Sequence, residues 1–384
     1  MPMNILIIQT AFIGDVVLTT PLIRATKTAF PNVRVSILVI PFTADVLGNN
    51  PYLDEIIRYD KKGEDRGLSD FLRLARALKA RSFDVALLPH RSLRSAALAR
   101  IARIPRRIGF DLSPASFLYT DVVPYRHDAH EVERNLDLLH ALGIEPEPIA
   151  PQIFPDEGDY ENADAQLDCG LKTHRKDAKN AKNFKTSALP FPASSATPRC
   201  KNPKSEIRNP KWKKGWAVGV APGSIWPTKR WPLESFAQVT DRLMKIGVQV
   251  ILIGGVSDRA LCDEIARKTA HAPLVAAGRL TLRESAALLA RCDLLLSNDS
   301  APVHIAAAMG TPVVALFGPT TPNLGFAPYG SGHTVLEVPL DCRPCGKHGG
   351  KRCPKRHFRC MKNLASERVF GVIMAKLERT KKGY

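Results

Sequence analysis

Short apolar runs alternate with amphipathic stretches along most of the chain. Runs such as NILIIQ, at residues 4–9, have the length of a buried strand, and stretches such as FLRLARAL, at residues 71–78, place apolar residues at helical spacing. Strands that alternate with helices in this way are typical of βα units on a mostly parallel sheet.

The pattern divides into two similar sets of predicted elements. The first set predicts strands at 4–9, 34–40 and 83–89 and helices at 15–29, 68–80, 93–104 and 130–142. The second set predicts strands at 216–221, 249–253, 293–297 and 312–317 and helices at 233–246, 258–269, 282–291, 302–309 and 365–378. We therefore expect an α/β fold of two doubly wound domains, with a ligand site in the cleft between them at the carboxyl ends of the strands.

Length, composition and charge support this division. The chain has 384 residues, enough for two domains, and its 45% hydrophobic and 24% charged residues exclude collagen, coiled coil and wholesale disorder. The net charge of +18 suggests nucleic acid, but half of it is local, because residues 163–214 hold 13 Lys and Arg against 4 Asp and Glu. This segment is rich in Pro, Asn, Ser and Lys and lacks apolar periodicity, so we predict a disordered basic insert.

Cysteine use and the first residues favour the cytosol. No apolar run reaches 18 residues, and the N-terminus lacks the positive start of a signal peptide. The eight cysteines are then expected to be reduced thiols. Four of them lie within 19 residues, with two histidines among them, at Cys342, Cys345, Cys353 and Cys360. This spacing fits a structural metal site, a cysteine-rich surface loop or a motif without metal.

Several common motifs are absent. The sequence has no G-x-G-x-x-G, G-x-x-x-x-G-K-[ST], H-E-x-x-H or G-x-S-x-G, so dinucleotide oxidoreductases, P-loop NTPases, zincins and α/β-hydrolases lose their usual support. It also has no D-x-D pair. An enzyme that holds a nucleotide diphosphate without such carboxylates neutralises the phosphates with lysine and helix dipoles, so we expect no catalytic metal and no cofactor.

The first candidate residue is Asp15, in the turn that follows the first predicted strand. Gly14 before it permits a tight or left-handed backbone, and Asp15 stands where the next helix begins. A carboxylate in this position either caps the helix, which stabilises it by about 1 kcal/mol, or serves as a general base at the mouth of the cleft. Position alone leaves both roles open.

Two candidate loops follow the first two strands of the second set. The loop APGSIWPTKRWP, at 221–232, offers Ser224, Lys229 and backbone N–H groups to phosphate oxygens, with a solvated polar loop as the alternative. Asp258 comes after a strand and a glycine pair, where a carboxylate either binds ribose hydroxyls or caps the next helix.

The last candidate segment is SNDSAPVH, at 297–304. A predicted strand runs into polar residues and then into a helix that begins with proline, so free N–H groups and the positive end of the helix dipole face the cleft. His304 lies in the first turn of this helix, with Asp299 and Ser300 in the preceding loop. A helical histidine is usually structural, but these neighbours favour a role in binding.

These motifs together resemble glycosyltransferase family 9, the ADP-heptose:lipopolysaccharide heptosyltransferases, and within it most closely the heptosyltransferase II branch. The likeness covers residues 3–160 and 215–378, and the insert falls outside it. The stretches that carry it are FIGDVVLTTPLIRA, APGSIWPTKRWP, LSNDSAPVHIAAAMGTPVVALFGPT and CRPCGKHGGKRCPKRHFRCM. The N-D-S-x-x-x-H segment combined with PTKRWP, in this order, is far more specific than either motif alone.

The resemblance implies a GT-B fold and a metal-independent, inverting transfer of heptose from ADP-heptose to the inner core of lipopolysaccharide, with heptosyl-Kdo2-lipid A as acceptor. The site residues that it implies are the general base Asp15, the pyrophosphate contacts Ser224 and Lys229, the ribose contact Asp258, and the sugar and phosphate contacts Asp299, Ser300, Ala301 and His304. Many family members have glycine at the position of Ala301, so this chain adds a methyl group where the backbone approaches phosphate.

The resemblance also implies a role for each part of the chain. Residues 1–162 are expected to form the acceptor-side domain, 163–214 the insert, 215–364 the ADP-heptose domain, and 365–384 a C-terminal helix and tail. A basic protein without a transmembrane segment is expected in the cytoplasm, peripheral to the inner membrane that carries its lipid A–core acceptor. No specific nucleic-acid partner is expected.

Other classes stay compatible with the residues alone. A different GT-B sugar-nucleotide transferase or an epimerase shares the fold and the phosphate contacts. A non-catalytic two-domain protein that binds nucleotide sugars would have the cleft but no need of Asp15. A nucleic-acid binder is suggested only by charge, because the sequence shows neither RNP aromatics nor a helix-turn-helix pattern.

Overall fold

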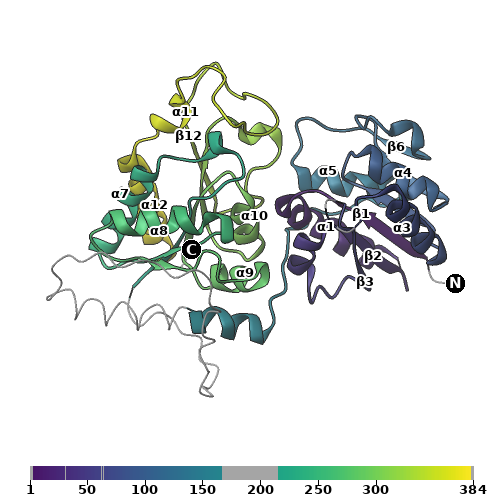
Figure 1. The fold of residues 1–384 in the computed structure, drawn as a ribbon, viewed down its shortest axis with the longest axis horizontal. Coiled ribbons are helices and arrows are strands. Elements are labelled where there is room, and N and C mark those ends of the chain that lie inside the picture. The colour runs from purple at the N-terminus through teal and green to yellow at the C-terminus, as the bar shows by residue number, and fades with distance from the viewer. Residues whose placement is uncertain (1–2, 31, 62, 64, 167–214, 382–384) are drawn as a thin grey trace.

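The computed structural model describes residues 3–30, 32–61, 63, 65–166 and 215–381. Two α/β domains lie side by side, each built on a six-stranded sheet whose neighbouring strands are all parallel (Figure 1). Among the described residues, no helix combines the length and the apolar character needed to cross a bilayer.

The N-terminal sheet has the strand order β3-β2-β1-β4-β5-β6. Its strands are β1 (Asn4–Ile8), β2 (Arg34–Val39), β3 (Glu55–Arg58), β4 (Val85–Leu88), β5 (Arg106–Phe110) and β6 (Asp121–Val123). The helical segments around it are α1 (Ile13–Ala29), α2 (Pro41–Ala44), η1 (Asp45–Leu47), α3 (Leu68–Ala80), α4 (Leu93–Ile101), η2 (Ser116–Leu118), α5 (Glu131–Asp137) and η3 (Leu138–Leu142).

The C-terminal sheet has the order β12-β11-β10-β7-β8-β9. Its strands are β7 (Ala217–Ala221), β8 (Gln249–Leu252), β9 (Leu274–Val275), β10 (Leu294–Asn298), β11 (Val313–Phe317) and β12 (Thr334–Glu337). The helical segments are η4 (Pro227–Lys229), α7 (Leu233–Lys245), η5 (Val256–Asp258), α8 (Arg259–Lys268), α9 (Leu282–Ala290), α10 (Ala301–Ala308), η6 (Pro322–Leu324), α11 (Arg359–Lys362) and α12 (Ser366–Lys381). Counted from its own first strand, this sheet repeats the order of the N-terminal one.

The two sheets have their topological switch points at corresponding places. In the N-terminal sheet β1 and β4 lie side by side at the switch, and in the C-terminal sheet β7 and β10 do. Doubly wound sheets bind ligands beyond the carboxyl ends of the strands at this point. Helices α1 and α10, which follow β1 and β10, pack against each other between the domains (Figure 1). The fold therefore brings the two candidate edges together.

Apolar packing and an ion-pair cluster hold the domains against each other. One buried apolar cluster includes Val17 and Leu18 of α1 together with Val303 and Ile305 of α10. At the start of α9, Arg283 lies 3.2 Å from Asp159 and 3.3 Å from Asp45, which come from the N-terminal half of the chain.

Residues 157–166 form a further helix, which packs against the C-terminal domain below α9 in Figure 1. Asp164 accepts a hydrogen bond from Arg291 at 2.8 Å, and Ala163 is fully buried. Residues 163–166, which were expected to begin the insert, therefore continue a packed helix. The prediction rested on the average composition of 52 residues, which does not show that Ala163 is buried or that Asp164 is paired. The rest of the predicted insert, 167–214, lies outside the described residues.

Each predicted strand and helix has a counterpart within a few residues of its expected bounds. The helix predicted at 130–142 is α5 followed by the 3-10 segment η3, and Gly143 ends it with a left-handed φ of 77°. The pattern missed five strands, which are short or lie near the sheet edges, namely β3, β5, β6, β9 and β12.

Candidate active site

The first turns of α1 and α10 meet closely between the domains. A Cβ added to Gly14 would lie 2.8 Å from Cδ2 of His304, so any larger residue would force the imidazole or the two helices to shift. Gly14 is part of helix α1 and has no positive φ, so the left-handed conformation that glycine permits is not used here. Close packing is the reason for glycine. His304 is 5% exposed and its Nδ1 makes no hydrogen bond with a described residue, and burial lowers its pKa to about 4.

Asp15 lies in the same first turn of α1 and lines a cavity between the domains. Helix α1 begins at Ile13 with Phe12 as its N-cap, so Asp15 is the third helical residue and not the N-cap that was expected. Its Oδ2 accepts the N–H of Phe12 at 3.1 Å. Burial raises the pKa of Asp15, while the Phe12 N–H and the positive charges of Arg91 and Lys229 oppose the rise. The bond satisfies a backbone donor at the start of the helix, and the same residue lines the cavity, so the bond is compatible with the role of a base.

Lys229 and Asp299 form an ion pair that joins the loops after β7 and β10. The distance from Nζ to Oδ2 is 2.5 Å, and the two side chains are only 12% and 7% exposed. The hydroxyl of Thr320 donates to the same carboxylate oxygen at 2.6 Å. The charge of Lys229 acts on both Asp15 and His304, so these predicted site residues gather around the contact between α1 and α10.

Asn298 fixes the spacing of the two loops. Its amide donates to the carbonyl of Pro222 at 2.7 Å, and its Oδ1 accepts the N–H of Trp231 at 3.0 Å. Ser300 precedes α10 and donates to the carbonyl of Gly223 at 3.2 Å, and Ala301 is the first residue of the helix. The positive end of α10 is thus held beside the 221–232 loop, a place suited to an anion.

Ser224 and Asp258 lie beside the same loop backbone. Ser224 is 8% exposed, and its Oγ accepts the N–H of Trp226 at 3.3 Å. Asp258 accepts the N–H of Gly255 at 3.0 Å, and its carboxyl group leaves no room for a Cβ on Gly223. Asp258 precedes α8, but its side chain makes no cap hydrogen bond to that helix and instead closes the 3-10 segment η5. The expected cap of the next helix is therefore wrong, and the carboxylate lies next to the loop that was expected to bind phosphate.

The cavity between the domains has a volume of about 370 Å³. Its N-terminal wall includes His90 and Arg91, which follow β4 directly. Burial, and then the charges of Lys61 and Arg91, lower the pKa of His90 to about 4, so this imidazole is neutral at pH 7. The guanidinium of Arg91 stacks on the ring of Tyr125 at 4.1 Å. The sequence reasoning missed these residues, although their place after a predicted strand was a usable signal.

Glu131 and Arg134 also line the cavity and were missed. They form a buried ion pair at 3.0 Å on α5. A Glu–Arg pair three residues apart is usually a solvated surface pair, so no sequence signal distinguished this one.

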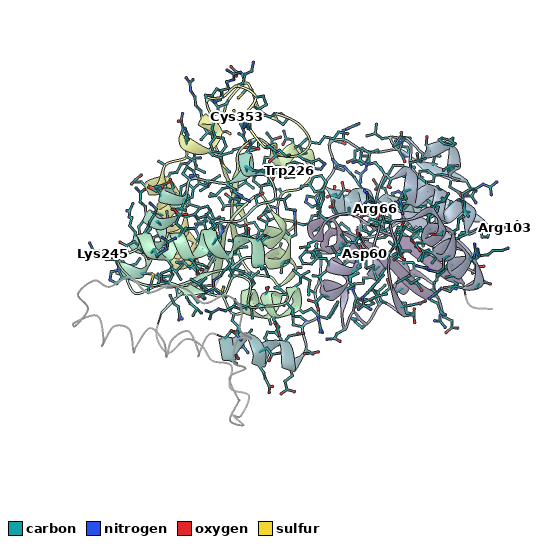
Figure 2. All side chains as sticks on the ribbon, in the orientation of Figure 1. Asp60, Arg66, Arg103, Trp226, Lys245 and Cys353 are labelled. Carbon is teal, nitrogen blue, oxygen red and sulfur yellow. The ribbon has the colours of Figure 1, made fainter. Side chains whose placement is uncertain are left out.

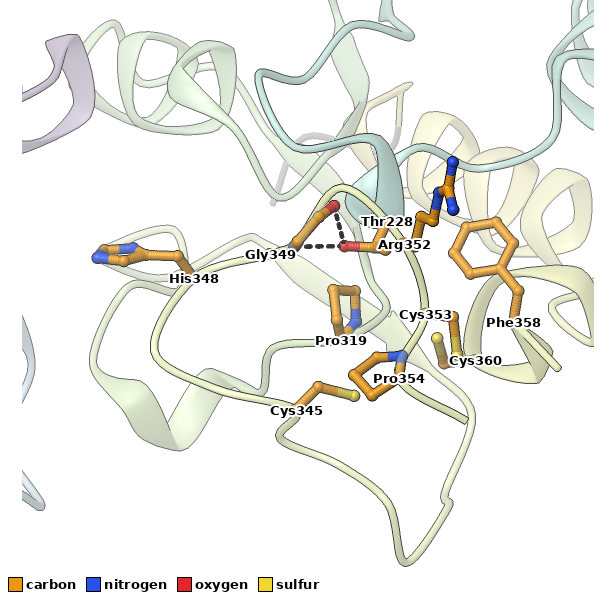
Figure 3. A pocket seen from close by; sticks show the side chains of 11 residues that line it. Thr228, Pro319, Cys345, His348, Gly349, Arg352, Cys353, Pro354, Phe358 and Cys360 are labelled. Carbon is orange, nitrogen blue, oxygen red and sulfur yellow. Dashed lines mark hydrogen bonds between the residues drawn. The ribbon is translucent and has the colours of Figure 1, made fainter. Parts of the chain in front are cut away.

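The segment between β12 and α11, residues 338–358, contains three of the clustered cysteines and is called the cysteine-containing loop. It reaches the cavity through Lys347 and His348. Figure 3 shows its anchor, two hydrogen bonds between the hydroxyl of Thr228 and the backbone of Gly350, at 2.9 and 2.7 Å. The imidazole of His348 also stacks on Trp226, with ring centroids 6.2 Å apart. Figure 2 places Trp226 close to the N-terminal domain and Cys353 at the outer end of the loop region.

The cysteines themselves lie around a separate, smaller pocket. Cys345, Cys353 and Cys360 line it (Figure 3), and Sγ of Cys342 lies 3.8 Å from Nε2 of His357. In the described ranges, no three His, Cys, Asp or Glu side chains are placed to hold a metal ion. The spacing that suggested a metal site is therefore not matched by a ligand set in this structure.

Comparison with known proteins decides the family. The model of glycosyltransferase family 9 (heptosyltransferase) matches residues 71–355. The chain belongs to this family. It is 26% identical over 335 residues to lipopolysaccharide heptosyltransferase 2 of Salmonella typhimurium, with 84% of each chain covered. It is 29% identical over 322 residues to lipopolysaccharide heptosyltransferase 3 of Escherichia coli, with 80% of each covered.

Solved structures support the fold. The structure of E. coli ADP-heptose LPS heptosyltransferase II aligns with a TM-score of 0.72 and 22% identity, covering 99% of this chain and 100% of that one. The GT-B arrangement of two doubly wound domains expected for a family 9 member is therefore confirmed, and the protein is a glycosyltransferase.

Proposed function

We propose that this family 9 glycosyltransferase transfers heptose from ADP-heptose to the inner core of lipopolysaccharide, with heptosyl-Kdo2-lipid A as acceptor. The observation that carries the proposal is that Asp15, on α1 of the N-terminal domain, lies close enough to the Lys229–Asp299 pair of the C-terminal domain for the charge of Lys229 to act on it. A base from one domain and a phosphate-binding cation from the other are what a displacement at an anomeric carbon requires.

The donor is assigned to the C-terminal wall. Lys229 and Ser224 would contact the pyrophosphate, Asp258 the ribose, and the first turn of α10 the sugar and β-phosphate. The contacts of Ser300 and Asp258 with Gly223 support this assignment, because they place both residues beside one backbone segment. Negative charge that develops on the departing β-phosphate is stabilised by a lysine and a helix N-terminus already in place, so no divalent metal is needed.

The reaction inverts the anomeric carbon in this proposal. An acceptor hydroxyl attacks that carbon from the side of Asp15, the new oxygen–carbon bond forms as the bond to the β-phosphate breaks, and the proton passes to the Asp15 carboxylate. ADP leaves with the electron pair. Burial supports the role of Asp15, because a raised pKa makes its carboxylate a stronger base than an exposed one.

The acceptor is assigned to the cavity on the N-terminal side. Arg91 and Lys347 both line it, and neither makes an ion pair with a described residue. Two cations without carboxylate partners favour an anionic acceptor, and acidic inner-core sugars have that chemistry. We place the enzyme in the cytoplasm at the inner membrane surface, where such an acceptor is anchored. We keep residues 1–162 and 215–364 as the acceptor and donor domains, apart from residues 157–162, whose helix packs against the donor domain.

The proposal is tested by incubating the protein with ADP-heptose and heptosyl-Kdo2-lipid A. We expect ADP release and a product heavier than the acceptor by one heptose, both unchanged in EDTA. Asp15→Asn should still bind ADP-heptose but lose turnover by a factor on the order of 10²–10⁴, the usual contribution of a general base. Transfer from another nucleotide sugar only, or full turnover by Asp15→Asn, would overturn the proposal.

A further inference from the structure

The outer side of α4 carries apolar residues where a surface helix normally carries polar ones. Leu93 and Ile101 are 54% and 44% exposed, and they lie on the same side of the helix, about two turns apart. Arg100, beside Ile101, is also exposed. A helix that packs on a sheet with one side keeps polar side chains on the other, so two large aliphatic side chains there need a reason.

Phe117 extends this apolar surface from the neighbouring loop. It is 75% exposed and belongs to η2, which packs against α4. The guanidinium of Arg107 holds η2 in place, because it donates to the carbonyl of Leu118 at 2.8 Å. Single exposed apolar side chains are ordinary, whereas large ones on elements that pack together mark a binding surface.

The same part of the chain is strongly basic. Residues 68–107 contain ten Lys and Arg against two Asp, so this segment and residues 163–214 together account for nearly all of the net charge of +18. Arg100 and Arg103 are exposed and make no ion pair with a described residue. Burial, and then the charge of Arg100, lower the pKa of Arg107, which shows that these cations are close together.

Carboxylates near these arginines are paired with other residues. Asp70 lies 3.0 Å from Arg73, and Asp121 lies 2.9 Å from Arg106. The charge of Arg100 and Arg103 is therefore available to an anionic partner. We call this surface the basic apolar face and define it by Leu93, Arg100, Ile101, Arg103 and Phe117.

The basic apolar face extends to the rim of the cavity assigned to the acceptor. Arg91 lines this cavity and lies two residues before Leu93, and Leu112 lines it from the loop that carries Phe117. At the other end of the face, Arg103 points away from the C-terminal domain (Figure 2). A broad partner that covers the face would therefore also reach the cavity.

We propose that the basic apolar face docks on the anionic surface of a phospholipid bilayer, with Phe117 and Ile101 entering the headgroup region and the arginines binding lipid phosphates. That this brings the cavity to its substrate rests on the function proposed above, whose acceptor is anchored in a membrane. Nucleic acid would also attract the arginines, but it has no use for an exposed aliphatic side chain such as Leu93. A second copy packed on the face symmetrically would bring like charges together.

The apolar part is tested by co-sedimentation of the full chain with vesicles of phosphatidylethanolamine and phosphatidylglycerol. Phe117→Ser should weaken binding roughly tenfold, the lower end of the range for a phenylalanine that leaves an apolar environment. Phe42→Ser is the matched control, because Phe42 is 68% exposed in the same domain but belongs to α2, which packs against α1. The control should bind like the wild type.

The basic part is tested with a pair of charge substitutions. The double variant Arg100→Gln with Arg103→Gln should bind these vesicles roughly tenfold more weakly at low salt, and the difference should shrink as salt is raised. Lys245→Gln with Arg267→Gln removes the same charge from exposed positions on α7 and α8, and it should bind like the wild type. Every variant keeps residues 163–214, so a loss confined to the first pair comes from the face.

Heptose transfer separates docking from catalysis. With a heptosyl-Kdo2 oligosaccharide that lacks lipid A, Phe117→Ser and the arginine double variant should match the wild type, and they should be slower only when the acceptor is embedded in vesicles. A wild type that transfers heptose to neither acceptor refutes the proposed function, while the vesicle comparison still tests the docking.

The proposal is overturned by unchanged vesicle binding in either Phe117→Ser or the arginine double variant, and by an equal loss in the matched controls. Weaker binding of RNA by the arginine variant, with vesicle binding unchanged, would assign the face to nucleic acid. Loss of a dimer in analytical ultracentrifugation of Phe117→Ser, again with vesicle binding unchanged, would assign it to a second copy of the chain.

Discussion

Substitution of Gly14 by alanine probes the contact on which the candidate site depends. The added Cβ would lie 2.8 Å from Cδ2 and 3.4 Å from Nε2 of His304. Carbon atoms in good contact are about 3.5–4.0 Å apart, so α1 and α10 would have to separate by roughly 1 Å. His304 is buried at the domain contact.

Two opposing effects set the size of the change. Alanine favours a helix over glycine by about 1 kcal/mol, whereas overpacking in a filled interior costs about 1–3 kcal/mol. Gly371→Ala in α12 isolates the first effect, because a Cβ there meets nothing within 4 Å. We expect Gly371→Ala to be stabilised and Gly14→Ala to be destabilised in urea unfolding. A displacement of roughly 1 Å between Asp15 and the donor loops should also lower kcat/KM about 100-fold.

A double-mutant cycle assigns the effect to His304. In a His304→Ala background the ring is gone, so Gly14→Ala should lose its cost in the free energy of unfolding and show only the helix gain. The reasoning is refuted if Gly14→Ala matches the wild type in stability and turnover. It is also refuted if the cost persists without the imidazole, because another neighbour would then be responsible.

Two further predictions concern the charged groups of the cleft. Lys229→Ala should weaken ADP binding, measured by calorimetry, by a factor on the order of 10–100, which is the range of a charge-assisted hydrogen bond. The control Lys245→Ala, on the exposed end of α7, should leave the affinity unchanged, and equal affinities of the two variants would place Lys229 outside the donor site. The pKa of His304 is about 4 in the folded protein against about 6.5 unfolded, so its contribution to stability is present above pH 6.5 and lost as pH falls toward 4. Between pH 7.5 and 5 the wild type should lose about 2 kcal/mol more unfolding free energy than His304→Gln, and parallel pH profiles would contradict the assigned burial.

The order of helices and strands could be predicted from the sequence because it depends on local periodicity. Buried central strands such as β1 and β10 are continuous apolar runs, and helices such as α3 carry a regular apolar face, so both patterns are visible without a partner. β5 begins with Arg106 and Arg107, and two charged residues interrupt the apolar run that would predict a strand. In the fold, Asp121 on the neighbouring strand β6 pairs with Arg106 at 2.9 Å. The edge strands have only two to four residues, which is too short to show the alternation of apolar and polar residues typical of a strand.

The candidate site was predictable where residues lie in the segment that follows a strand. Asp15 lies in the first turn after β1, Lys229 in the segment after β7, and Asp299 immediately after β10. The expected cleft at the carboxyl ends of both sheets made their convergence an expectation. Glu131 and Arg134 come from a helix that approaches from the side, and their meaning depends on carbonyls of Leu324 and Gly325, almost 200 residues later. Only the folded chain shows that this ion pair is buried.

Gly14 shows most clearly what tertiary structure alone decided. Local reasoning marks a glycine before a helix as a site of unusual backbone, yet its φ here is ordinary and the reason for glycine is the imidazole of His304, which lies on another domain. Local sequence specifies which backbone conformations are accessible and which faces are apolar. Contacts between residues distant in the chain specify the space left for a side chain, the partner of a charge and the proton affinity of a buried carboxylate, because each depends on atoms that only the fold brings near.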